Sequence, residues 1–232
     1  MNRCTEAIVL AAGGSKRLGH PKQLVRYRGT TLLDRVVDQL IRVDCDRITV
    51  VLGADAATIA RGCPSLSGRP PFERVETVIN PLHREGQSTS LRCGLGHVLN
   101  RAAHGPIPRG RVLIALCDQP MIPTRHYREL VSINGDANPV VTTDYGDRGG
   151  VPMCIDGNLI DDLVRHLAGD VGAKIWIENQ PGPVRRVVCP EAFRDIDTPK
   201  DLERWLERDS ERCLERDSER WLEKNPSGGF NG

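Results

Sequence analysis

Short apolar runs alternate with amphipathic stretches along most of this chain, and this alternation constrains its fold more than any other feature. Residues 7–11 form a continuous apolar run of the kind found in strands that are buried on both faces. Similar runs recur along the chain, at residues 48–52, 75–79, 112–116, 140–143 and 151–155. Helices are predicted between some of these runs, at residues 32–41 and 88–99, and after the last of them, at residues 159–167.

Strands that alternate with helices predict a mostly parallel sheet covered by helices on both faces, which is a three-layer α/β/α domain. Two stretches rich in Pro, Gly and Ser or lacking periodicity, 63–71 and 102–110, are predicted to be loops.

Composition excludes several classes of protein. The 32 Lys and Arg against 31 Asp and Glu leave a net charge of only +1, and aromatic residues make up 4 %. Proteins that coat nucleic acid need a basic excess or stacking aromatics, so no nucleic-acid partner is expected. No apolar run approaches the roughly 20 residues that span a bilayer, so no membrane partner is expected either.

Cysteine and histidine usage points to the cytoplasm and away from zinc. The eight cysteines contain no CxxC pair, and the six histidines contain no HExxH motif. A chain of 232 residues can bury an adequate core without disulfides, so we expect reduced thiols. Residues 1–6 lack the pattern of a signal peptide, which also favours a cytoplasmic location.

The C-terminal part contains a repeat that separates it from the rest. Residues 206–213 (LERDSERC) are followed by residues 214–221 (LERDSERW), which differ only at the last position. A period of eight builds no continuous apolar stripe on a helix, so we expect a solvated, charged helix and then a disordered tail. The alternative is an oligomer contact through Trp205, Cys213 and Trp221. We therefore divide the chain into a domain at 1–205 and an extension at 206–232.

The loop after the first run carries the strongest chemical signal. Residues 10–22 (LAAGGSKRLGHPK) combine small residues with three cations at the end of a predicted strand, where open α/β sheets bind ligands. Small residues let phosphates approach backbone N–H groups, and Arg17 and Lys22 add positive charge. The loop fits neither GxxxxGK[ST] nor GxGxxG. The alternative is a plain glycine-rich turn.

The motifs in this chain resemble those of the MobA-like nucleotidyltransferases, most closely the molybdenum cofactor cytidylyltransferase branch. The resemblance covers about residues 5–205 and consists of blocks in the family's order. These blocks are LAAGGSKRLGHPKQL at 10–24, NPLHREGQSTSLRCG at 80–94, LCDQP at 116–120, GVP at 150–152, GDVGAK at 169–174 and DIDTP at 195–199. The chain departs from the family at Val151, where His is usual, at Lys174, where Arg is usual, and at His83, where an aromatic is usual.

The resemblance implies a fold like that of the nucleotide-diphospho-sugar transferases, which is Rossmann-like. It also implies nucleotidyl transfer from an NTP, with CTP favoured, to molybdenum-bearing molybdopterin, with release of pyrophosphate. A molybdoenzyme or its maturation factor would then be a partner. Two alternatives stay open: nucleotidyl transfer to a sugar phosphate or another small phosphometabolite, and a non-catalytic carrier of the molybdenum cofactor.

The expected site has four sets of residues, which follow from the needs of nucleotidyl transfer together with the resemblance. Arg17, Lys22 and Asp118 are the predicted catalytic residues, and Asp118 with Asp197 is predicted to hold Mg²⁺. The other predicted nucleotide-binding residues are Leu10, Ala11, Ala12, Gly13, Gly14, Ser15, Asn80, Ser88 and Ser90. The predicted acceptor-binding residues are Gln119, Pro152, Asp170 and Lys174.

Several of these residues have structural alternatives. Asp118 could form an Asx turn before Pro120, and Asp195 or Asp197 could cap a helix that begins at Pro199. Ser88 and Ser90 could cap the helix predicted at 88–99, and Gln119 could support Asp118 without touching the acceptor.

Overall fold

The computed structural model describes residues 5–15, 18–103, 110–133, 135–169, 172–193, 200–201 and 203–204. Its centre is a seven-stranded sheet in the order β5-β4-β1-β6-β8-β7-β9. The strands are β1 (Thr5–Ala11), β4 (Arg47–Leu52), β5 (Val75–Ile79), β6 (Arg111–Leu116), β7 (Val140–Asp144), β8 (Gly149–Asp156) and β9 (Val184–Val188). A small hairpin of β2 (Arg26–Tyr27) and β3 (Thr30–Thr31) stands apart from this sheet.

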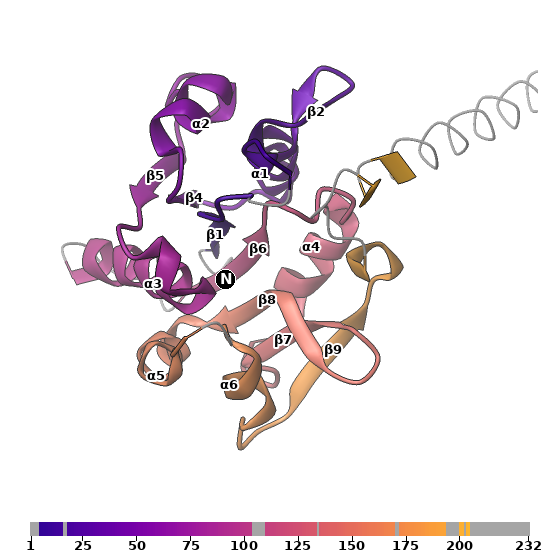
Figure 1. Ribbon diagram of the computed structural model, residues 1–232. Helices are drawn as coiled ribbons and strands as arrows, with labels where there is room; N and C mark the ends of the chain where they lie inside the picture. The colour runs from indigo at the N-terminus through magenta and orange to yellow at the C-terminus, as the bar shows by residue number, and fades with distance from the viewer. Residues whose placement is uncertain are drawn as a thin grey trace, which may run out of the picture.

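Helices cover both faces of the sheet, which confirms the predicted three-layer α/β/α architecture (Figure 1). One face carries α1 (Leu32–Val43), α2 (Ala56–Gly62) and α4 (Thr124–Ser132), and the other carries α3 (Gln87–Ala103), α5 (Ile160–His166) and α6 (Lys174–Glu178). Residues 7–11 are continuously apolar because β1 is buried on both faces of the sheet. Val9 packs against one helical layer and Ile8 against the other.

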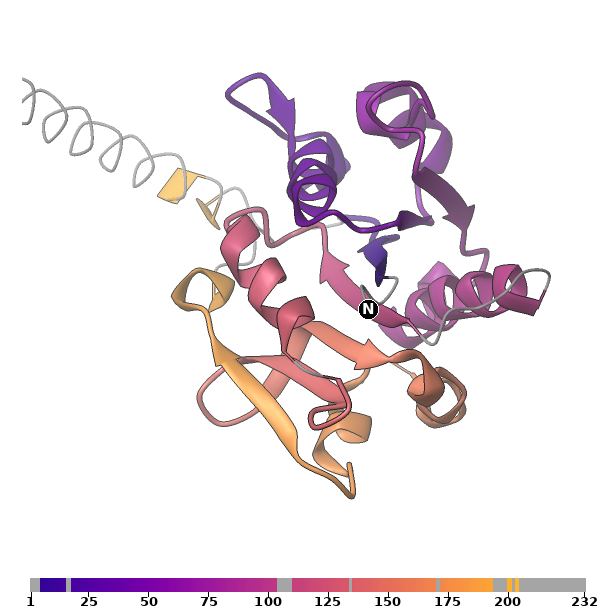
Figure 2. The same cartoon turned by 180° about the vertical axis from the view of Figure 1, so that it is seen from behind.

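The sheet is mostly parallel, as predicted, with one antiparallel strand. β1 pairs in parallel with β4 and β6, β4 with β5, and β7 with β9. β8 runs antiparallel to both β6 and β7. The connection from β7 to β8 spans only residues 145–148, which is too short for a parallel crossover. In the view from behind, α4 crosses the half of the sheet that contains β8 (Figure 2).

The parallel strands place their carboxyl ends at one edge of the sheet. Leu10 of β1 lies beside Val51 of β4 on one side and Leu116 of β6 on the other. The loops that follow these three strands therefore meet above the middle of the sheet, where open α/β folds bind ligands.

The cysteines in the described residues are mostly buried. All six carry free thiols, and five of them are buried. Burial raises the pKa of the Cys63 thiol to about 11 and that of Cys45 to about 12, so both stay protonated at neutral pH. Within the described part of the chain, no helix is long and apolar enough to span a bilayer. The predicted C-terminal repeat and tail lie outside the described residues.

A buried histidine on α4 links two strands of the antiparallel half. The Thr143 hydroxyl donates to the Pro152 carbonyl at 2.8 Å, so it must accept its 2.8 Å hydrogen bond from Nε2–H of His126. The His126 side chain is only 3 % exposed, and this burial lowers its pKa from the ordinary 6.5 to about 4.

We expect His126 to make the free energy of unfolding depend on pH between about 6.5 and 4. In this window His126 binds a proton in the unfolded chain but not in the native protein, so the free energy of unfolding falls as the pH falls. A shift of this size corresponds to about 3 kcal/mol at the acid end. His126→Gln keeps a hydrogen-bond donor and removes the titration. Urea unfolding at pH 7, 5.5 and 4.5 should therefore give a smaller acid loss for the variant, and equal losses would contradict the assignment.

Candidate functional site

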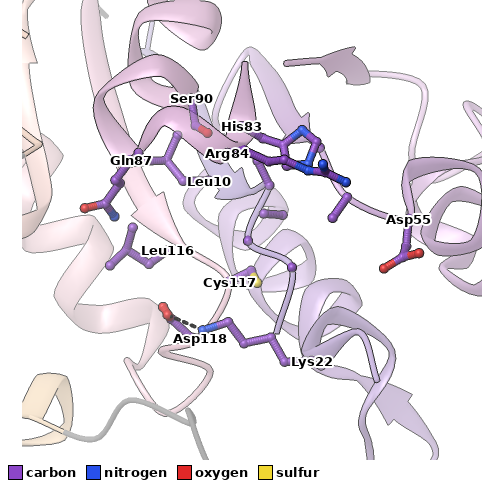
Figure 3. A pocket seen from close by; sticks show the side chains of 17 residues that line it. Leu10, Lys22, Asp55, His83, Arg84, Gln87, Ser90, Leu116, Cys117 and Asp118 are labelled. Carbon is purple, nitrogen blue, oxygen red and sulfur yellow. Dashed lines mark hydrogen bonds and ion pairs between the residues drawn. The ribbon is translucent and has the colours of Figure 1, made fainter. Parts of the chain in front are cut away.

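A cavity of about 850 Å³ opens where the carboxyl ends of β1, β4 and β6 meet. Figure 3 shows Lys22 and Asp118 at one end of this cavity and His83 and Arg84 at the other. Its walls come from the four segments after β1, β4, β5 and β6. The lining residues in the described part of the chain are Leu10, Ala11, Ala12, Gly13, Gly14, Lys22, Gly53, Ala54, Asp55, His83, Arg84, Gly86, Gln87, Ser90, Leu116, Cys117 and Asp118.

The predicted nucleotide loop after β1 forms one wall, and its shape is fixed by the completely buried Gln23. The Gln23 amide donates to the carbonyl of Ala11 at 2.7 Å and to that of Gly13 at 3.0 Å. Farther along the loop, the Ser15 hydroxyl accepts from the backbone N–H of Lys22 at 2.9 Å. Residues 11–15, the described start of this loop, are therefore held in place by side chains and backbone close to them in the sequence. Ser15 therefore stabilises the loop through its hydrogen bond with Lys22. Arg17 lies outside the described residues.

We expect Gln23→Met to weaken nucleotide binding in protein that is still folded. The variant keeps the side-chain volume but leaves two backbone carbonyls without their donor, which costs about 1–3 kcal/mol per buried group. Nucleotide affinity, measured by calorimetry, should fall about 10-fold or more because the loop is no longer held. Gln180→Met is the matched control, since that amide donates to the Trp176 carbonyl away from the cavity. Equal effects in the two variants would contradict this role for Gln23.

Lys22 and Asp118 form an ion pair at one end of the cavity. Lys22 begins the short 3₁₀ helix Lys22–Leu24, and Asp118 follows β6 two residues after its end. Lys22 Nζ lies 2.7 Å from Oδ2 of Asp118, and the two side chains are 12 % and 22 % exposed. The structure thus brings together two of the three predicted catalytic residues, which lie 96 positions apart in the sequence.

The turn that carries Asp118 is fastened on two sides by side chains of other elements. Arg35 Nε of α1 donates to the Pro120 carbonyl at 3.0 Å. Gln119 is 3 % exposed, and its amide donates to the Tyr145 hydroxyl at 3.0 Å and to the Ala192 carbonyl at 3.3 Å. Gln119 therefore supports the Asp118 turn from below, which is the second of the two roles considered for it.

The opposite wall depends on close approach of two backbones. A Cβ atom on Gly53 would lie 2.6 Å from Cβ of His83 and 2.7 Å from the Ala12 carbonyl oxygen. Only glycine therefore lets the segment after β4 pass between these two loops. His83 Nδ1 lies 3.2 Å from the Asn80 carbonyl oxygen, and the neighbouring Arg84 is exposed at the cavity.

Asn80 and Ser88 support this wall from behind and do not line the cavity in the described structure. The Asn80 amide donates to Ser90 Oγ at 3.0 Å and to Thr89 Oγ1 at 2.9 Å. The Ser88 hydroxyl donates to the Ala168 carbonyl at 3.1 Å and accepts from Gly172 N–H at 3.2 Å. Of these three predicted residues, Ser90 alone reaches the cavity. Ser88 ties the start of α3 to the 168–172 loop.

The predicted acceptor residues are spread over several elements. Pro152 is buried in β8, where its carbonyl accepts from Thr143. Lys174 begins α6, is 52 % exposed and lies 4.0 Å from Glu178. Asp170 lies outside the described residues. Gly172, between Asp170 and Lys174 in the sequence, lies close to the cavity, because an added Cβ there would lie 3.1 Å from Oε1 of the lining residue Gln87.

One carboxylate in the cavity fits a divalent cation. Oδ1 of Asp118 is buried and has no hydrogen-bond partner in the structure, so this oxygen is left for a ligand. The described residues contain no group of three or more His, Cys, Asp or Glu side chains arranged for a metal. A single carboxylate still suits Mg²⁺, which takes its other ligands from water and substrate phosphates. Asp197, the second predicted ligand, lies outside the described residues.

The sequence analysis did not predict the cavity wall opposite Lys22 and Asp118, nor the buried side chains that hold the loops in place. Asp55, Arg84 and Gln87 line the cavity without having been predicted to do so, and Gln23 and Tyr145 hold its parts. A signal was present for some of them. His83 and Arg84 sit inside the 80–94 block, and Asp55 follows the strand at 48–52, where parallel strands present ligand-binding loops.

A glycine-rich loop, a lysine and an aspartate surround a cavity at the carboxyl edge of a parallel sheet, which is where α/β proteins bind small ligands. Sequence comparison then gives the family. The chain belongs to the family described by the MobA-like NTP transferase domain, whose model matches residues 7–184. This membership places it among the nucleotidyltransferases.

The individual relatives carry names that point to different activities. The chain is 31 % identical to nicotine blue oxidoreductase of Paenarthrobacter nicotinovorans, with 88 % of this chain and 97 % of that protein aligned. It is 29 % identical to the bifunctional protein GlmU of Bifidobacterium animalis, where 67 % of this chain matches 34 % of that protein.

Among solved structures, Rv0371c of Mycobacterium tuberculosis superposes with a TM-score of 0.72 at 28 % identity, covering 89 % of this chain and all of that one. A manganese complex of Rv0371c superposes with a TM-score of 0.66 at 26 % identity, covering 88 % of this chain and 98 % of that one.

Proposed function

We propose that this protein transfers a nucleotidyl group from CTP to a phosphorylated acceptor, molybdenum-bearing molybdopterin, and releases pyrophosphate. The observation that carries the proposal is the Lys22–Asp118 pair beside the glycine-rich loop, inside a cavity of about 850 Å³. This volume lies within the usual range for small-molecule sites. The choice of CTP and of molybdopterin rests on the sequence blocks at 80–94 and 116–120.

In this proposal the chain's own residues position the triphosphate and balance its charge. The backbone of Ala11–Gly14, held by Gln23, receives phosphate oxygens, and Lys22 stabilises the negative charge that develops at the α-phosphate. Asp118, together with Asp197, would hold Mg²⁺, and the cation would neutralise phosphate charge when bound. Arg17 would add a second positive charge to the same loop.

The remaining residues divide the cavity into a nucleoside end and an acceptor end. His83, Arg84 and Ser90 lie at the end away from Lys22 and offer hydrogen-bonding groups to a base or ribose. The acceptor would approach past Gln87, from the side of the 168–172 loop and Lys174. Gln119 and Pro152 would shape that side from within the fold.

The deciding experiment is a panel of the four NTPs with Mg²⁺, with and without molybdopterin, read as pyrophosphate release. Release that requires both CTP and molybdopterin supports the full proposal. Release with another NTP or with a sugar phosphate keeps nucleotidyl transfer and replaces the substrate. Nucleotide and pterin binding without pyrophosphate release would identify a non-catalytic carrier.

A second candidate function is oxidoreduction, because the relative named nicotine blue oxidoreductase aligns over 97 % of its length. The same cavity would then hold a nicotinamide dinucleotide in place of an NTP. Oxidation of NADH or NADPH by the same preparation, with a quinonoid dye as acceptor, tests this candidate. Hydride transfer needs no lysine beside a carboxylate that could hold a divalent cation, so the Lys22–Asp118 pair favours nucleotidyl transfer.

A further inference from the structure

The Asp118 carboxylate could pair with either of two cations, the ammonium of Lys22 or a divalent metal ion. In the absence of ligand, Asp118 gives Oδ2 to Lys22 at 2.7 Å, while Oδ1 is buried without a partner. Both side chains are largely buried, so solvent screens their attraction only weakly. A divalent cation that reached Asp118 would meet the ammonium of Lys22 within a few ångströms, and the two positive charges would repel each other.

We propose that Lys22 holds the place of the divalent cation on Asp118 in the free protein, so that metal and lysine compete for one carboxylate. The inference rests on the proposed function only in taking Asp118 as the cation ligand. Its consequence is an order of binding: the metal binds weakly until a polyphosphate offers Lys22 another anionic partner. Nucleotide and metal therefore enter together, and the free protein does not hold the metal tightly.

The structure allows this exchange without moving the backbone. The N–H of Lys22 is fixed to Ser15 Oγ at 2.9 Å, whereas the four-carbon side chain can pivot about its own bonds. The Asp118 turn is held by Gln119 and Arg35 rather than by the ion pair. Movement of one lysine side chain is thus enough to transfer Asp118 from the ammonium to the metal.

The test measures Mn²⁺ binding to the protein alone, by the loss of the free Mn²⁺ signal in electron paramagnetic resonance. Lys22→Met leaves the Asp118 charge uncompensated, so we expect Mn²⁺ to bind at least about 10-fold more tightly than to the wild type. Lys22→Arg keeps a competing cation and should resemble the wild type. Adding Asp118→Asn to Lys22→Met should remove the gain.

Arg42→Met is the matched control, because it breaks an exposed ion pair with Asp38 that lies on α1. Lys22→Gln serves as a second variant if Lys22→Met does not fold, as judged by circular dichroism and a thermal melt. Unchanged or weaker Mn²⁺ binding in the folded Lys22 variant overturns the competition. An equal gain in Arg42→Met also overturns it, because net charge alone would then explain the effect.

No nucleotide or turnover enters this measurement, so its outcome is separate from that of the proposed function. If pyrophosphate release is observed and Lys22→Met leaves Mn²⁺ binding unchanged, only the competition fails. If no NTP is consumed and Lys22→Met tightens Mn²⁺ binding in the presence of Asp118, the competition stands and the assigned reaction fails.

Discussion

Asp118→Asn is expected to lower the rate of pyrophosphate release by at least about 10³-fold while the protein stays folded. The substitution keeps the size of the side chain and one oxygen, but it removes the charge that would hold Mg²⁺ and pair with Lys22. The fold should survive because Gln119 and Arg35 fasten the turn through other atoms. Steady-state rates at saturating Mg²⁺, beside a thermal melt, check both halves of this expectation.

Asp38→Asn is the control, because this carboxylate on α1 pairs with Arg42 at 2.8 Å and is not among the described residues that line the cavity. Asp197→Asn should repeat the loss, and the double variant with Asp118→Asn should add little, since the two carboxylates would act as one unit. Asp195→Asn should matter less. Near-normal rates for Asp197→Asn at limiting Mg²⁺, with a loss in Asp195→Asn, would assign the second ligand to the other aspartate.

Lys22→Ala should reduce turnover by about 10²- to 10³-fold, the usual effect of removing one preorganised group that stabilises transition-state charge. The reason is that the Lys22 charge matters most when negative charge builds up at the α-phosphate. Initial rates over a range of NTP concentrations separate kcat from KM. A rise in KM with kcat intact would show that Lys22 binds ground state and transition state equally, which contradicts the role assigned here. Arg42→Ala, on the exposed face of α1, should change neither constant.

The interior of the sheet was predictable from the sequence, and its edges were less so. β1, β4 and β6 are buried on both faces, so their runs are apolar throughout and easy to recognise. β9 was not predicted because it lies at the sheet edge, where Arg185 and Arg186 are exposed and break the apolar pattern. α4 was also missed, since it buries His126 and Tyr127 in place of a longer aliphatic stripe.

The candidate site shows the same division. Lys22 and Asp118 were predictable because both follow apolar strands, and the carboxyl ends of parallel strands lie at the same edge of a sheet. The residues that hold them were not, because their contacts join distant parts of the chain. Gln119 and Tyr145 lie 26 positions apart, and nothing local in either segment indicates the pairing. Gln23 looks like an ordinary polar residue until the fold buries it completely.

The bonds from Gln23 to the Ala11 and Gly13 carbonyls also decide when the segment at residues 11–14 becomes ordered. A flexible glycine-rich segment would lose about 1–2 kcal/mol of conformational entropy per residue at the moment it closed around a ligand. In this protein the conformational entropy of the segment is lost during folding, before any ligand binds, because the Gln23 side chain already fixes its conformation. A ligand that binds at this edge should therefore enter a preorganised site. The entropy change of binding should then be dominated by released water rather than by ordering of the chain.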